Sequence, residues 1–299
     1  LRGRSVEQVL VLVDGVRRSD PQPGHFDLDL VVPPERVDRL EILRGPPSAV
    51  YGSDALGGVV NIVTRDGLDA YNPEGTIRAE GGSFGRWGWG FDATTPTGPW
   101  RVGVAASQDV ADGHRDGPED SILRGSGRLV GPAAGGRLSL EGGYSRRDFG
   151  AAEFYAPYNS YEETRTTTAT ARWARTLGGG GSIEPRVSYR QRDDDFVLVR
   201  ADPEFFRNLH DSRELTTELT ARLPRGRAGG LALGGEWSRQ SLESTNLGDR
   251  EQDILAVFGE AQLWTGPFRL QGGVRFDDRD DVGSFVSPSG SVMFEAGRG

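Results

Sequence analysis

The segment from Pro34 to Asp66, PERVDRLEILRGPPSAVYGSDALGGVVNIVTRD, decides how this chain of 299 residues folds. In residues 37–43 apolar side chains interleave with charged ones, as they do in a β-strand. The run stops at the Arg-Gly-Pro of 44–46, because proline has no amide hydrogen to give to a sheet. The β-branched run 59–63 predicts a second, buried strand. The segment therefore encodes two strands joined by a glycine-hinged turn.

An apolar run upstream, QVLVLVDGVR at 8–17, predicts a further strand that ends in an Asp-Gly turn. Residues 47–51 can form one helical turn, and the glycines that follow allow backbone angles that a side chain would forbid. In this order and spacing, residues 1–66 resemble the plug domain of TonB-dependent outer-membrane receptors. The positions that carry the resemblance are Asp14, Gly15, Arg44, Gly45, Pro46, Tyr51, Gly52, Gly57, Gly58 and Asn61.

The rest of the chain has the period-two pattern of transmembrane β-strands. In residues 86–93, Trp87, Trp89 and Phe91 alternate with glycine and aspartate, which predicts an aromatic face toward lipid and a polar face toward a lumen. The same alternation recurs in 138–145, 214–223 and 268–277. No apolar run is long enough for a membrane helix, so insertion in a membrane would use strands.

The connections alternate between short and long, as in outer-membrane barrels. Short ones are expected at 97–99, 131–136, 177–181, 224–230 and 265–267, and would be periplasmic turns. Long polar stretches at 110–120, 147–163, 193–211 and 243–250 would be extracellular loops. The sequence shows no blade repeat of the kind that a β-propeller would carry.

The fold class expected is therefore mostly β: a partial transmembrane antiparallel β-barrel with the later part of an α/β plug. The plug would occupy residues 1–67 and the barrel 75–299, with about twelve strands. A closed barrel of about twelve strands is too narrow for a folded plug, and plugged transporters have 22 strands. We therefore expect the chain to be a fragment with about half of a barrel.

Composition limits the function without deciding it. The net charge of −9 argues against a nucleic-acid partner. The mean hydropathy of −0.49 would suit a soluble protein, but in a barrel only every other strand residue faces lipid. The chain has no cysteine, so disulfides and cysteine-ligated metals are ruled out. The three histidines, His25, His114 and His210, lack the spacing of a metal site and are expected to be solvated loop residues.

The resemblance implies active uptake of a scarce, large ligand, energised by the inner-membrane TonB complex and the proton gradient. It implies an outer-membrane location in a Gram-negative bacterium, with lipid and lipopolysaccharide around a monomer, no cofactor and no enzymatic activity. Cobalamin and a ferric siderophore are both open as the ligand, because the contact loops vary freely. A passive porin or a surface-binding barrel would have no reason to carry a plug. A secreted β-rich enzyme would need a catalytic constellation, and none is visible.

Certain charged residues can be given roles. Arg44 resembles the plug arginine that joins the plug to the barrel wall in this family, and Glu236 and Glu260 resemble its glutamate partners. Both glutamates fall at lumen-facing positions of their strands, and lining a wet lumen is an equally open role for them. We predict that Arg44 approaches at least one of these carboxylates, because an unpaired buried charge is costly.

Two acidic clusters, 193–195 and 277–281, could in principle form calcium-binding loops. Asp193 and Asp195 are the weak candidates for ligands, because oxygen-rich loops sometimes hold calcium. Neither cluster has the spacing of a known calcium loop, so solvated charge is the expected role and no metal is predicted.

Overall fold

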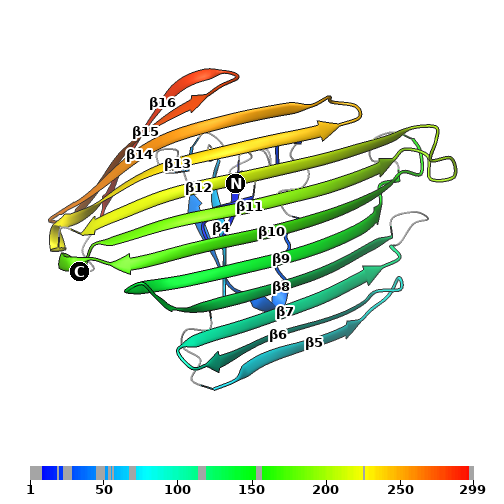
Figure 1. The fold of residues 1–299 in the computed structure, drawn as a ribbon, viewed down its shortest axis with the longest axis horizontal. Helices are drawn as coiled ribbons and strands as arrows, with labels where there is room; N and C mark the ends of the chain where they lie inside the picture. The colour runs from blue at the N-terminus through cyan, green and yellow to red at the C-terminus, as the bar shows by residue number, and fades with distance from the viewer. Residues whose placement is uncertain are drawn as a thin grey trace.

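The computed structural model describes residues 9–18, 20–22, 29–44, 51–52, 55, 57–66, 72–113, 119–152, 157–224 and 226–295; the side chains of Arg44 and Arg227 lie outside this description. Within these residues the chain forms two sheets. A small four-stranded sheet precedes a large twelve-stranded one, and in Figure 1 the small sheet lies behind the large one. We call the large sheet the wall.

The small sheet has the strand order β2-β1-β4-β3. Its elements are β1 (Val9–Val13), β2 (Val16–Arg17), the short 3-10 helix η2 (Pro34–Arg36), β3 (Val37–Arg44) and β4 (Gly58–Thr64). β1 runs parallel to β4, whereas β2 and β3 are antiparallel to their neighbours. The strands predicted on either side of the glycine-hinged turn are confirmed.

β1 is apolar throughout because both of its faces are buried. Val11 and Val13 join one apolar cluster, with Val31, Val32 and Ile62. Leu10 and Leu12 join another on the opposite face, with Ala55, Val59 and the partly buried Tyr51. In β4, Val59 and Ile62 are buried as predicted, while Val60 and Val63 are half-buried.

The wall is an antiparallel meander in which each strand pairs with the next along the chain (Figure 1). Within the described residues its twelve strands are β5 (Glu74–Gly81), β6 (Trp87–Thr97), β7 (Trp100–Ala111), β8 (Asp120–Ala133), β9 (Gly136–Gly150), β10 (Tyr161–Thr176), β11 (Ser182–Val197), β12 (Arg207–Pro224), β13 (Gly229–Ser244), β14 (Arg250–Thr265), β15 (Phe268–Arg279) and β16 (Gly283–Phe294). The predicted short turns are confirmed, and two contain one-turn 3-10 helices, η4 (Gly178–Gly180) and η5 (Gly226–Ala228).

The wall has one face turned toward the small sheet and one turned away, because side chains alternate along each strand. Trp87 and Phe91 lie on the outer face, with 44% and 37% of their surface exposed, and the next residue, Asp92, is buried on the inner face. The predicted outward direction of the β6 aromatics is confirmed. No helix of the described residues is long and apolar enough to cross a membrane.

The wall strands are longer than the sequence suggested, so the predicted long loops were too wide. The connection expected at 193–211 shrinks to the residues between Val197 and Arg207, and Asp193 and Asp195 lie within β11. The other acidic cluster also falls largely on a strand, since β15 extends to Arg279. The error has a physical reason: near the long loops even the outward-facing residues are polar, so the strand loses its apolar signature while its ladder continues.

Candidate functional site: the seam between the small sheet and the wall

Charged residues between β1 and β3 fasten the small sheet to the inner face of the wall. The contacts cross long sequence separations, and most place an acidic residue of the small sheet against an arginine of the wall. The pairs are Asp14 with Arg128, Asp20 with Arg190, Asp29 with Arg192, Glu35 with Arg78 and, in the opposite sense, Arg36 with Asp92. We call this set the seam.

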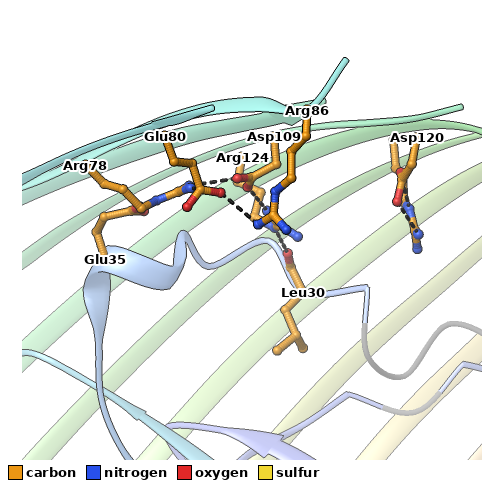
Figure 2. Close-up of polar contacts among 9 residues, drawn as sticks. Leu30, Glu35, Arg78, Glu80, Arg86, Asp109, Asp120 and Arg124 are labelled. Atoms are coloured by element: carbon orange, nitrogen blue, oxygen red, sulfur yellow. Dashed lines mark hydrogen bonds and ion pairs between the residues drawn. The ribbon is translucent and has the colours of Figure 1, made fainter. Parts of the chain in front are cut away.

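One deeply buried pair of the seam joins η2 to β6. Arg36 Nε donates to Asp92 Oδ2 over 2.7 Å, and the two side chains are 1% and 5% exposed. The preceding Glu35 accepts from Arg78 Nε over 2.5 Å, and Figure 2 shows these two side chains meeting beside η2. Glu35 and Arg36, which are adjacent and opposite in charge, therefore both bind side chains of the wall.

Arg124 of the wall binds the backbone of the segment that precedes η2. Its guanidinium donates to the carbonyl of Leu30 over 3.1 Å and to Asp109 over 3.2 Å (Figure 2). Asp109 also accepts from Arg78 over 2.9 Å. The wall arginines of β5 and β8 therefore share one wall carboxylate while each holds a different part of residues 30–35.

The Asp-Gly turn predicted after β1 is a node of this seam. Asp14 has a positive φ of 50°, and its carboxylate accepts from the amide and the hydroxyl of Thr64, over 2.9 and 2.6 Å. The same carboxylate accepts from Arg128, which also donates to Glu141 on β9 and to the carbonyl of Arg65. One side chain thus ties β1, the end of β4 and the wall together.

Contacts near Asp14 also explain why Gly15, Asn61 and Gly52 occur at their positions. The amide of Gly15 donates to Asn61 over 3.0 Å, and Asn61 donates to Glu41 of β3 over 3.0 Å. Gly52 has a φ of +79°, and a Cβ there would stand 3.3 Å from Arg17 and 3.4 Å from Arg275. Glycine at 52 therefore provides both a left-handed backbone and room for two guanidiniums.

Asp20, Gln22 and Asp29 are held by β10 and β11. Arg190 donates to Asp20 over 2.7 Å, and Gln22 donates to Asp194 over 2.7 Å. Asp29 accepts from Arg192 and from Thr164, over 3.2 and 3.0 Å. Every one of these side chains except Thr164 carries a charge or an amide, so Asp20, Gln22 and Asp29 are held by polar contacts.

The predicted partners of Arg44 have other contacts in the structure. Glu236 accepts from Arg275 over 3.1 Å, and Glu260 accepts from Gln262 over 3.2 Å. Both carboxylates face the inner side of the wall as expected, and both line a cavity of about 830 Å³ between the small sheet and strands β11–β15. The side chain of Arg44 lies outside the described residues, as do Gly45 and Pro46, so the pairing stays a prediction.

The remaining candidates are placed as follows. His210 lies on β12 and is 8% exposed, so the expectation of a solvated loop residue was wrong for it; His25 and His114 lie outside the described residues. Asp195 accepts from Arg207 in a two-bond ion pair of 2.6 and 2.8 Å. In the part of the chain that the structure describes, no three acidic, histidine or cysteine side chains are grouped to hold a metal ion.

Sequence reasoning missed the acidic residues of the seam, Asp14 apart. Asp20, Asp29 and Glu35 lie in the stretch between the Asp-Gly turn and β3, which has no strand periodicity. The available signal was the wall: inward positions of β8 and β11 carry Arg124, Arg128, Arg186, Arg190 and Arg192, and buried cations require carboxylates.

Comparison with known proteins now gives the class of protein. Residues 1–59 match the family model "TonB-dependent Receptor Plug Domain". The small sheet is therefore the plug, and the wall is part of a transmembrane antiparallel β-barrel that holds it. In sequence and in fold the chain is similar to TonB-dependent receptors.

Individual relatives carry more specific names. The chain is 28% identical over 309 residues to the vitamin B12 transporter BtuB of Photobacterium profundum, an alignment that covers 95% of this chain and 48% of the relative. The vitamin B12 transporter BtuB of Vibrio cholerae serotype O1 is 48% identical over 65 residues, which are 22% of this chain and 10% of the relative.

Solved structures share the fold. The siderophore receptor PirA from Pseudomonas aeruginosa superposes with a TM-score of 0.80 at 24% identity, covering all of this chain and 53% of PirA. The ferric enterobactin receptor PfeA of the same organism, solved in complex with enterobactin, gives 0.78 at 21% identity, covering 98% of this chain and 53% of PfeA. The chain spans about half the length of these relatives.

Proposed function

We propose that the whole protein takes up a scarce, large ligand across the outer membrane of a Gram-negative bacterium, with energy from TonB and the proton gradient. The observation that carries the proposal is the seam, in which buried ion pairs fasten the plug to the inner face of the wall. We infer that a plug held in this way blocks free diffusion through the whole barrel. Opening such a lumen requires work, because removing one partner of a buried pair leaves an uncompensated charge. A passive porin needs no such closure.

Cobalamin is the first ligand to test, and a ferric siderophore is the second. A relative whose similarity covers 95% of this chain is named a vitamin B12 transporter. The siderophore receptors share less than 25% identity and support the fold alone.

The outer face of the wall supports a membrane location. Outward positions such as Leu140, Val187, Leu219, Leu233 and Val257 are apolar and between 39% and 53% exposed, as lipid-facing strand residues are. Near the long loops the outward positions become charged and pair across strands, as Arg146 does with Glu163 and Arg239 with Asp253. We assign this belt to the lipopolysaccharide headgroups around a monomeric barrel.

The same proposal includes TonB as the energy-coupling partner and a contact of Arg44 with Glu236 or Glu260. If Arg44 holds the plug, Arg44→Ala in the full-length receptor increases leakage of large antibiotics, and the double variant Glu236→Gln, Glu260→Gln gives the same leakage without adding to it. Fully additive leakage would leave these carboxylates as lining of a wet lumen.

Uptake itself is tested in a strain that lacks the gene. Growth on limiting cobalamin, and separately on iron supplied as a ferric siderophore, is compared with and without the full-length receptor. We expect the receptor to restore growth on one of the two ligands only when TonB and the proton gradient are intact. Uptake that continues in a strain without TonB would refute active transport and favour the passive barrel.

A further inference from the structure

The seam contains ion pairs of two kinds, which differ in whether each charged side chain keeps another partner after the pair separates. We propose that η2, with Glu35 and Arg36, is the fixed point of the plug, and that the hairpin around Asp14 is the part that releases first. This inference concerns how the plug is held and does not depend on which ligand the receptor carries.

Backbone packing is the first argument. Among the described elements of the plug, η2 approaches the wall backbone over three strands, β5, β6 and β7. The wall carries glycine where the two charged side chains enter. A Cβ at Gly90 would stand 2.1 Å from a carboxylate oxygen of Glu35, and a Cβ at Gly103 would stand 2.9 Å from Arg36 Nη2. Neither Gly90 nor Gly103 has a positive φ, so the backbone conformation does not require glycine at these positions. The wall therefore forms a socket for Glu35 and Arg36.

Among the described ion pairs, the pair of Arg36 with Asp92 has no reserve partner, whereas Arg78, which binds Glu35, also binds Glu80 and Asp109. Asp92 is bound by Arg36 alone in the ion pairs of the described residues. Pulling η2 out of the socket leaves Asp92 as an unpaired carboxylate in a buried place. Buried charges without compensation are among the costliest defects in a protein.

The contact at Asp14 is built differently, because both partners keep other bonds when they separate. Arg128 Nη2 donates to Asp14 and also to Glu141, its cross-strand neighbour on β9. Asp14 retains the amide and hydroxyl of Thr64. When the hairpin leaves the wall, neither charge is stranded, so this contact opens at lower cost than the one at Arg36.

The experiment follows amide hydrogen exchange of the full-length receptor in detergent micelles as urea is raised below global unfolding. The amide of Arg36, which donates to the carbonyl of Pro33, reports on the socket. The amides of Asp14 and Gly15, which donate to Ile62 and Asn61, report on the hairpin. We expect the hairpin amides to become exchange-competent at lower urea than the Arg36 amide.

Variants separate the two contacts. Arg36→Ala, or Asp92→Asn if that protein does not fold, should speed exchange at the socket about a hundred-fold or more. Asp14→Asn should speed exchange at the hairpin and leave the socket unchanged. The matched control is Arg86→Ala, which removes an arginine whose ion pair with Glu80 is largely exposed and should change neither.

Two results would overturn the proposal. One is a socket that opens together with the hairpin, or before it, in the unmodified receptor. The other is an effect of Asp92→Asn no larger than that of Arg86→Ala. Because the readout is exchange in the plug, a failure here is distinct from a failure of ligand uptake, which is measured by growth.

Discussion

Asp14 offers the sharpest test of how the plug is assembled, because asparagine and alanine remove different parts of its role. Asp14→Asn keeps an oxygen for the amide of Thr64 and suits the positive φ of 50°, but it removes the charge that faces Arg128. Asp14→Ala also removes both bonds to Thr64 and places an ordinary side chain in the left-handed region.

The expected losses follow from these contacts. A hydrogen bond to a charged group contributes roughly 1.5–3 kcal/mol, and Arg128 retains Glu141, so we expect Asp14→Asn to destabilise the node by about 2 kcal/mol. In the asparagine variant each bond to Thr64 is neutral and contributes about 1 kcal/mol, and the left-handed backbone costs alanine roughly 1–2 kcal/mol more. Asp14→Ala should therefore cost about 5 kcal/mol in all.

The assay is hydrogen exchange of the Thr64 amide in the full-length receptor, converted to a free energy of local opening. The amide should remain partly protected in Asp14→Asn and lose most of its protection in Asp14→Ala. Equal losses in the two variants would show that the charge on Arg128, rather than the turn and Thr64, dominates the node. No change in either variant would refute the reasoning.

Three further substitutions test other parts of the structure. Gly103→Val should displace a plug guanidinium from the wall and weaken exchange protection of η2, whereas Gly125→Val, where a Cβ meets nothing within 4 Å, should not. Phe91→Arg puts a charge toward lipid and should lower the free energy of unfolding by roughly 2–4 kcal/mol, whereas Thr97→Arg, near the strand end, should lower it by roughly 0–1 kcal/mol. The folded fraction in heat-modifiability gels measures the difference, and equal folded fractions would contradict the outward assignment. Gly52→Ala should destabilise the plug by roughly 1–2 kcal/mol through its positive φ, and an unchanged urea midpoint for loss of plug protection would count against that strain.

The sequence was sufficient for features that depend on local pattern. The alternation around Trp87 and Phe91 predicted the direction of β6, and the Asp-Gly turn after β1 predicted the hairpin. Both rest on backbone geometry that repeats every two residues or on a turn that two residues define. The same logic predicted that Glu236 faces inward.

The rest depended on contacts that no local pattern records. Arg36 and Asp92 are 56 positions apart, and Asp20 and Arg190 are 170 apart, so their pairing appears only once the plug sits in the wall. The length of β11 was underestimated because Asp193 and Asp195 alternate with Asp194 and give a run of carboxylates that looks like a loop. Strand pairing, which the sequence does not show, continues through that run.

The polarity of the seam has a consequence for the order in which the protein is built. Arg78, Arg128, Arg190 and Arg192 of the wall each receive a carboxylate from the plug. A wall that forms before the plug enters would present these guanidiniums to its interior, and their combined field would draw in a segment rich in aspartate and glutamate. Assembly of the two parts should then be fast at low ionic strength and slow in concentrated salt, since screening shortens the reach of that field. The ion pairs that hold the plug in place would thus also serve as its guide during folding.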